Sequence, residues 1–136
     1  PVLELDSSRS VTPWVYGLEA KSKDVGADGS PGYFCPADIE PELEKKLKYF
    51  ALRAHQLLYT LDVSRTDIRL DEEGNPRVME INTLPGLTPD YSDLCLQAKA
   101  EDIRYEDLVL DILYLGASRW GMLEPREHVP EMQKKR

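Results

Sequence analysis

Apolar residues recur at steps of three and four from residue 43 to residue 61, and this spacing predicts a long amphipathic α-helix. Pro41 suits the first turn of that helix, where a proline loses no hydrogen bond. His55 lies at the border of the apolar face, so we expect it to be a half-buried helix residue rather than a metal ligand. The residues expected to face the protein interior are Leu43, Leu47, Phe50, Ala51, Ala54, Leu57, Leu58 and Leu61.

Two more helices are predicted towards the C-terminus. A short helix is expected from about Ser92 to Ala100, and a second amphipathic helix from Tyr105 to about Ser118, with Gly116 near its end. The interior face of the second one is expected to comprise Leu108, Val109, Ile112, Leu113 and Leu115.

Strands are predicted where apolar and polar residues alternate. Residues 64–70 and 77–81 form two such runs, and the turn-forming residues 71–76 between them predict a β-hairpin. A further short strand fits residues 2–5. Together these elements predict an α+β fold, in which a largely antiparallel sheet that contains the hairpin is backed by the long helix and the C-terminal helix.

Two segments show no pattern of helix or strand. Residues 17–32 are rich in glycine and contain almost no large apolar residue, which predicts a long mobile surface loop. Residues 119–136 have no clear periodicity and are expected to form a C-terminal tail. The rest of the chain, residues 1–118, is expected to form one lobe.

The composition narrows the class of protein. With 136 residues, of which 41% are hydrophobic and 31% are charged, the chain suits one compact domain. Its formal net charge of −8 leaves no broad basic surface for nucleic acid or for an anionic membrane. We therefore expect neither nucleic acid nor a membrane as a partner.

The sequence also indicates in which cellular compartment the protein resides. No apolar run approaches the roughly 18 residues that span a bilayer, and the N-terminus lacks the pattern of a signal peptide, so we expect a cytoplasmic protein. Cys35 and Cys95 are too few for a disulfide framework and too far apart for a C-x-x-C metal site, so both are expected to be reduced packing residues. Because the chain begins at Pro1 rather than at methionine, we expect a fragment or a processed product.

The predicted hairpin gathers its polar residues on one face. Antiparallel pairing keeps the sum of paired residue numbers constant, so a register with Leu70 opposite Arg77 also places Asp67 opposite Glu80. The polar face then comprises Arg65, Asp67, Glu80 and Asn82. The opposite, core-facing side comprises Ile68, Leu70, Met79 and Ile81. A slip by one residue would mix the two sets, so the apolar pattern supports this register.

Opposed acids on this face suggest a metal site. Two carboxylates that face each other across a strand pair repel at a cost of up to about 1 kcal/mol, unless a cation lies between them. Carboxylate and amide oxygens are hard ligands that suit Mg²⁺ or Mn²⁺. Arg65 would then be available for an oxyanion or a transferring phosphoryl group. The alternative is a surface ion network in which Arg65 and Arg69 neutralise the acids, and spacing alone leaves both interpretations open.

A Pro-Gly turn follows the polar face, and its Gly86 allows close backbone approach and presents an N–H to a ligand. Arg65-x-Asp67 and the run from residue 78 to residue 88 closely resemble the C-terminal signature of D-alanine–D-alanine ligases in the ATP-grasp superfamily. Residues 18–21 and 33–37 resemble the same family. The similarity runs from about Val2 to Gly116.

This resemblance implies a C-terminal lobe of the ATP-grasp fold in an ATP-dependent ligase. Such an enzyme phosphorylates the carboxylate of one D-alanine, and the amine of a second attacks the acyl phosphate, as in the synthesis of peptidoglycan for the cell wall. Two divalent ions, Mg²⁺ or Mn²⁺, bridge the phosphates of ATP. Carried over by position, the metal ligands would be Asp67, Glu80 and Asn82.

The resemblance also implies roles for residues around the metal. Arg65 and the Gly86 N–H would stabilise the tetrahedral intermediate. Lys21, on a loop that closes over the site, would contact phosphate or substrate, and Glu80 would reach ATP through the metal.

Two places depart from the family pattern and concern the acceptor substrate. Ser22 stands where the dipeptide-forming enzymes usually have tyrosine. Tyr91-Ser92 stand where the family has a serine-leucine pair that holds the acceptor carboxylate, although Ser92 could serve after a shift of one residue. A ligase for another acceptor, such as a D-hydroxy acid or another amine, is therefore an alternative.

The family's N-terminal substrate domain and central lobe are not recognisable in these residues. The expected partners are therefore the missing lobes of the same ligase and small-molecule substrates, and this fragment alone is expected to be inactive. A homodimer is one oligomeric state that the sequence allows. A hypothesis of a different class is a non-enzymatic metal-binding or scaffolding module, but a module without chemistry has no physical need for opposed acids.

Overall fold

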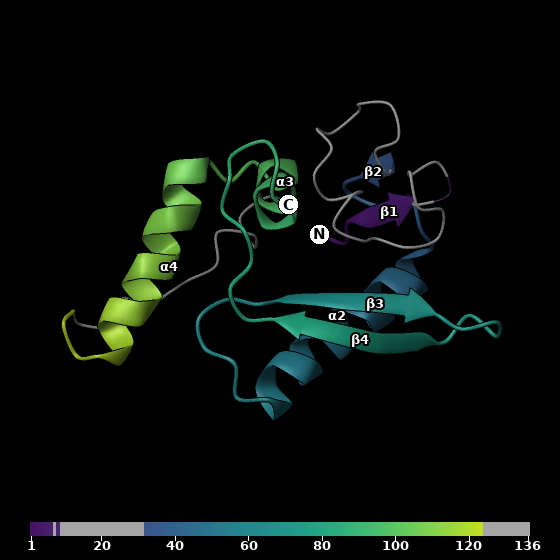
Figure 1. Cartoon of the computed structure of the whole chain (residues 1–136), viewed down its shortest axis with the longest axis horizontal. Helices are drawn as coiled ribbons and strands as arrows, with labels where there is room; N and C mark the ends of the chain where they lie inside the picture. Colours follow the sequence, from purple (N-terminus) through teal and green to yellow (C-terminus); the bar gives the residue numbers. More distant parts are fainter. Residues whose placement is uncertain (7, 9–31, 124–136) are drawn as a thin grey trace, which may run out of the picture.

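The computed structural model describes residues 1–6, 8 and 32–123 (Figure 1). Gly32, the last residue of the predicted glycine-rich loop, begins a strand. The other residues of that loop and most of the predicted tail lie outside the described residues. In chain order the elements are β1 (Glu4–Asp6), β2 (Gly32–Phe34), α2 (Pro41–Leu57), β3 (Arg65–Leu70), β4 (Pro76–Asn82), α3 (Asp93–Ala100) and α4 (Tyr105–Arg119).

All strand pairs in the described residues are antiparallel, and they form two separate sheets of two strands. The hairpin of β3 and β4 is one of them. In the other, Glu4 of β1 lies opposite Phe34 of β2 and Asp6 lies opposite Gly32. The strand expected at residues 2–5 is thus confirmed with shifted bounds, whereas β2 was not predicted because three residues are too few to show a period.

Helix α2 packs on the hairpin and lies behind it in Figure 1. The residues of its apolar face from Leu43 to Ala54 are half-buried, as predicted, and so is His55, whose Nδ1 lies 2.7 Å from the Ser64 hydroxyl. The last three predicted interior positions are wrong. Leu57, Leu58 and Leu61 are 63%, 59% and 57% exposed.

The early end of α2 explains this difference. Tyr59 adopts the left-handed conformation at φ 51°, and the N–H of Thr60 bonds to the His55 carbonyl at 3.1 Å, which is the Schellman pattern of helix termination. Helices α3 and α4 end in the same way, at Asp102 and Gly121. Of these three left-handed residues only Gly121 is a glycine. The end of α2 therefore lacks the glycine that would mark it in the sequence.

Helix α4 packs on α3 rather than backing the sheet with α2, so the predicted place of the C-terminal helix is wrong (Figure 1). Leu113 and Leu115 are consequently 64% and 47% exposed, while the rest of the predicted apolar face is half-buried. The end of α4 is tied to the segment before β3, because Arg119 Nη2 lies 2.6 Å from Asp62 Oδ2. Hydrogen bonding to Arg119 lowers the pKa of the Asp62 carboxyl.

Helix α3 carries three buried residues, Asp93, Cys95 and Ala98. Cys95 and Ala98 are 6% and 7% exposed. Cys95 and Cys35 are both free thiols, as predicted, and burial raises the pKa of each. Within the described ranges, none of the helices combines the length and the apolar character needed to cross a bilayer.

The connection between β3 and β4 is organised by Asp71. Its Oδ1 accepts the backbone N–H groups of Asn75 at 2.8 Å and Glu73 at 3.1 Å, and its Oδ2 accepts Arg77 Nε at 3.0 Å. Gly74 adopts φ +78°, which favours glycine. These hydrogen bonds, first of all the one from Asn75, lower the pKa of Asp71 from its ordinary value of 3.8.

We expect the hairpin to lose stability in acid through Asp71. Because the folded-state pKa lies below the ordinary value, the stabilisation is present above that value and is lost as pH falls through the folded pKa. Urea unfolding should show a larger loss of unfolding free energy between about pH 5 and about pH 2.5 in the wild type than in Asp71→Asn, which cannot titrate there. Equal losses in the two proteins would contradict this role.

Candidate active site

The candidate site is built on the hairpin, and its central pairs are those predicted. Asp67 of β3 lies opposite Glu80 of β4, and Arg65 lies opposite Asn82. Beyond them the register shifts between Asp67 and Ile68, so that Leu70 pairs with Pro76. The predicted pairing of Leu70 with Arg77 is therefore wrong.

The shift is a β-bulge that makes Met79 an extra residue of β4. Val78, not Met79, lies opposite Ile68 and shares its face. Met79 is 64% exposed and Leu70 is 46% exposed, so their predicted places on the core face are wrong, whereas Ile68 and Ile81 are half-buried. The bulge begins one step beyond the polar pairs, so it leaves the opposition of Asp67 and Glu80 intact.

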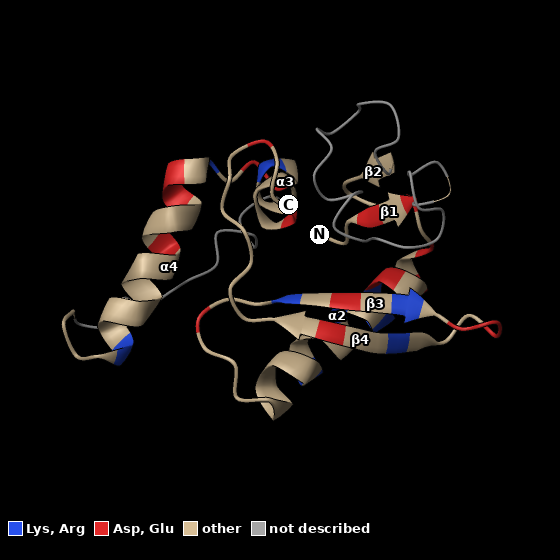
Figure 2. Ribbon diagram, in the orientation of Figure 1, with Lys and Arg blue, Asp and Glu red and all other residues tan. Residues whose placement is uncertain are grey.

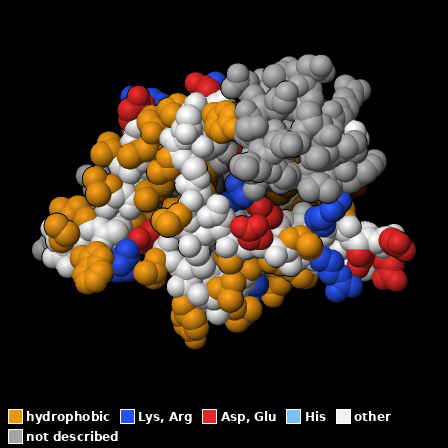
Figure 3. Space-filling view, viewed as in Figure 1, with side chains coloured by type: hydrophobic (Ala, Val, Ile, Leu, Met, Phe, Trp, Pro, Cys, Tyr) orange, Lys and Arg blue, Asp and Glu red, His pale blue; other side chains and the backbone are white. Residues whose placement is uncertain are grey.

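The two acids lie side by side on neighbouring strands, as Figure 2 shows. In the space-filling view, acidic side chains over the hairpin form a surface patch next to basic ones (Figure 3). The Asp67 side chain is 34% exposed and Glu80 is exposed. A ligand from solvent can therefore reach both carboxylates.

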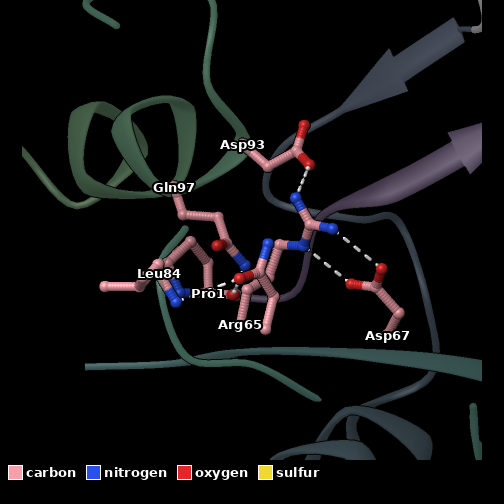
Figure 4. Close-up of polar contacts among 7 residues, drawn as sticks. Pro1, Arg65, Asp67, Leu84, Asp93 and Gln97 are labelled. Atoms are coloured by element: carbon pink, nitrogen blue, oxygen red, sulfur yellow. Dashed lines mark hydrogen bonds and ion pairs between the residues drawn. The ribbon is translucent and has the colours of Figure 1, made fainter. Parts of the chain in front are cut away.

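Arg65 lies between two carboxylates (Figure 4). Its Nε and Nη2 donate to the two oxygens of Asp67 at 2.7 and 2.9 Å, a bidentate pair. Its Nη1 donates to Asp93 Oδ2 at 2.7 Å. The pairing of Arg65 with Asp67 agrees with one part of the ion-network interpretation, but Arg65 is only 17% exposed, so this is not an ordinary surface pair.

Sequence reasoning missed Asp93. It is the first residue of α3 and belongs to none of the motifs considered above. An acid in the first turn of a helix is expected for the helix dipole alone, so only the fold reveals its contact with Arg65. Its side chain is 9% exposed, which makes it the most buried acid of the described ion pairs.

The Pro-Gly turn packs against the start of α3. A Cβ atom on Gly86 would lie 2.6 Å from the Ser92 hydroxyl oxygen, which also accepts the Thr88 N–H at 2.9 Å. Asn82 Oδ1 accepts the Leu84 N–H at 3.0 Å just before the turn. The turn thus joins the acidic hairpin to α3. Tyr91 is 37% exposed, and Lys21 and Ser22 lie outside the described residues.

We expect Gly86→Ala to displace the Ser92 hydroxyl and so break its bond from Thr88. The unfolding free energy should fall by about 1 kcal/mol. Urea titrations of Gly86→Ala, Ser92→Ala and the double variant check this, because the glycine substitution should cost less once Ser92 is alanine. Additive losses would show that the close contact is unimportant.

The predicted metal ligands fit a hard divalent cation. In the described part of the chain, no group of three or more His, Cys, Asp and Glu side chains could hold a metal ion. The predicted set instead combines the carboxylates of Asp67 and Glu80 with the amide oxygen of Asn82, donors that suit Mg²⁺ or Mn²⁺. Asp67 and Asn82 already accept hydrogen bonds, but each oxygen has a second lone pair.

The fold and this site together define an α+β lobe of the ATP-grasp type, with a helix-backed acidic hairpin that leads into a Pro-Gly turn. The family model described as "D-ala D-ala ligase C-terminus" matches residues 5–114, and the chain therefore belongs to this family. The resemblance inferred from the sequence and the predicted α+β class are both confirmed.

Individual relatives support the same family assignment. The chain is 35% identical over 119 residues to a D-alanine–D-alanine ligase of Nitrosococcus oceani, and the aligned region covers 88% of this chain and 35% of that protein. It is 46% identical over 97 residues to one from Erythrobacter litoralis, covering 69% of this chain and 28% of that protein. The crystal structure of the D-alanine–D-alanine ligase from Bacillus anthracis matches at a TM-score of 0.61 and 29% identity, over 68% of this chain and 30% of that chain. The chain thus spans about a third of the length of these relatives.

Proposed function

We propose that the chain is the C-terminal catalytic lobe of an ATP-dependent ligase that joins the carboxylate of one D-alanine to the amine of another. Membership of the family supports this proposal. The observation that carries it is the pairing of Asp67 with Glu80 next to Arg65 and Asn82. Opposed acids repel unless a cation lies between them, and an ATP-dependent ligase needs such a cation.

The proposed reaction balances as two steps. The γ-phosphoryl group of ATP passes to a carboxylate oxygen of the first D-alanine, the bond from its phosphorus to the bridging oxygen of the β-phosphate breaks, and ADP leaves. The amine of the second D-alanine then attacks the carbonyl carbon, the bond from that carbon to the phosphate oxygen breaks, and the amine loses a proton. An oxyanion develops on the carbonyl oxygen during the attack, and positioned N–H donors stabilise it.

Each proposed role uses donors present in the site. Asp67, Glu80 and Asn82 would hold Mg²⁺ or Mn²⁺, two ions in the complete enzyme, and the metal would offset the charge of the ATP phosphates. The Gly86 N–H and the guanidinium of Arg65 would stabilise the oxyanion. Arg65 suits this role because its planar guanidinium stays charged and is held in place at both ends.

The substrate contacts are proposed from sequence position. Lys21 would bind phosphate together with Glu80 acting through the metal, and Ser22 would lie near the acceptor. Ser92, with Tyr91 beside it, would hold the acceptor carboxylate. The place of Ser92 against the Pro-Gly turn supports this, since its hydroxyl can still donate a hydrogen bond after accepting the Thr88 N–H.

The other lobes of the same polypeptide are the proposed partners. Large apolar residues stay exposed on α2 and α4, among them Tyr49 at 60% and Leu113 at 64%, and Figure 3 shows hydrophobic patches on one face of the molecule. Contact with further lobes would cover part of this surface. The division into a lobe of residues 1–118 and a tail of residues 119–136 stays a prediction. The relatives named above are ligases, so they do not favour the scaffolding hypothesis.

Release of ADP tests the proposal. It should be measured with Mg²⁺, ATP and D-alanine, on this chain and on the natural polypeptide extended upstream to its own start codon. We expect activity in the extended form only. Activity that requires another amine or a D-hydroxy acid would keep the ligase but replace the acceptor, whereas no activity with any acceptor would overturn the function.

A further inference from the structure

Two acids hold Arg65, but they differ in position and burial. Asp67 lies two residues away on the same strand, and its side chain is 34% exposed. Asp93 comes from α3, 28 residues further along the chain, and its side chain is 9% exposed. In Figure 4 the guanidinium group reaches from β3 towards the start of α3, where Asp93 points back at it.

The two contacts also use different edges of the guanidinium group. Asp67 accepts hydrogen bonds from Nε and Nη2, and Asp93 accepts one from Nη1. Asp67 is also a proposed metal ligand, so its carboxylate has a second task in the loaded site. Asp93 belongs to no proposed metal-ligand set. A contact to Nη1 from α3 can therefore hold Arg65 while Asp67 turns towards a cation.

Burial makes the contact with Asp93 the more persistent one. Separating a buried ion pair leaves an uncompensated charge in a poorly solvated place, which costs more than separating a pair that water can reach. Arg65 is itself 17% exposed. When a ligand arrives, the more exposed contact with Asp67 is thus the one free to rearrange.

The residue before Asp93 lies against Gly86, which carries the other proposed oxyanion donor. The Ser92 hydroxyl lies against Gly86 and accepts the Thr88 N–H at 2.9 Å. Ser92 therefore contacts the Pro-Gly turn while Asp93 contacts Arg65. The start of α3 connects the two groups that would face the same oxyanion, one on the hairpin and one on the turn.

We propose that Asp93 is a positioning residue that holds Arg65 against the start of α3 and thereby sets its place relative to the Gly86 N–H. The role of Arg65 in catalysis rests on the proposed function, but the hold of Asp93 on Arg65 does not. Misplacement of a reacting or stabilising group by about 1 Å can cost on the order of 100-fold in rate. Asp93 thus acts through Arg65 and needs no contact with substrate.

The test compares Asp93→Asn with a matched control, Asp107→Asn, in the natural full-length polypeptide. Asp107 also lies in the first turn of a helix and pairs with an arginine, Arg104, at 2.7 and 2.8 Å, but its side chain is 46% exposed. Asp93→Asn should lower kcat between about 10- and 100-fold and leave the KM for ATP within about twofold. Asp107→Asn should leave both within about twofold of the wild type.

A second measurement needs no turnover. Hydrogen exchange of the Arg65 Nη1 protons, which face Asp93, followed by NMR, should be faster in Asp93→Asn than in the wild type and unchanged in Asp107→Asn. Unchanged exchange in Asp93→Asn would overturn the proposal. If the wild type shows no ligase activity with any acceptor, the proposed function fails, and exchange alone then decides the role of Asp93.

If the wild type is active, a normal kcat for Asp93→Asn would also overturn the proposal that Asp93 positions Arg65. Should that variant fail to fold, Asp93→Glu takes its place, because glutamate keeps the charge but moves the carboxylate by one methylene. A lowered kcat with an unchanged melting temperature would support the proposal. Wild-type values of both kcat and exchange in Asp93→Glu would exclude it.

Discussion

Replacing Glu80 by glutamine is expected to lower kcat of the full-length polypeptide by more than about 100-fold with little change in stability. Glu80 lies opposite Asp67 and is exposed, so glutamine can occupy the same place without disturbing the hairpin. The substitution removes one of the two carboxylate charges of the proposed metal site. ADP release under saturating Mg²⁺ and ATP is the measurement, and urea unfolding checks the fold.

Glu72→Gln is the matched control for this experiment. Glu72 is an exposed acid in the connection of the same hairpin, away from the opposed pair. Its replacement removes the same charge from the same supersecondary unit and should leave kcat within about twofold. Normal turnover of Glu80→Gln would exclude Glu80 from the metal site, whereas an equal loss in both variants would point to the net charge of the hairpin.

Replacing Arg65 by methionine is expected to cost both stability and activity. Asp93 would stay buried without this cationic partner, and Asp67 would lose its bidentate bonds. Removal of one partner from a buried ion pair destabilises a protein by about 3 kcal/mol or more. Urea titration should show this loss, and ADP release should fall by about 100-fold or more because a proposed oxyanion donor is gone.

Arg77→Met is the control that separates the effect of burying an ion pair from the effect of removing a positive charge. Arg77 is also on the hairpin and also pairs with an aspartate, Asp71 at 2.9 Å, but its side chain is 68% exposed. Its loss should change the unfolding free energy by less than about 1 kcal/mol. Similar losses in the two variants would mean that the burial of Arg65 and Asp93 has no energetic consequence.

Helix ends and packing partners were the weaker part of the sequence prediction. The sequence pattern located the three helices of the described residues, but it extended α2 to Leu61 because nothing in the sequence marks Tyr59 as left-handed. The same pattern marked Leu113 and Leu115 as interior, although α4 packs on α3 and leaves both exposed. Periodicity reports that a face is apolar, but it does not report what covers that face.

The sequence by itself determined the hairpin, the pairing of Asp67 with Glu80, and the family. These depend on alternation within short runs and on a motif whose residues are neighbours in the chain. Only the tertiary structure decided the bulge at Met79 and the pairing of Arg65 with Asp93. The first depends on how β4 fits against β3, and the second joins residues 28 positions apart on different elements. No local pattern records either contact, because its energy arises only once the separate segments have packed together.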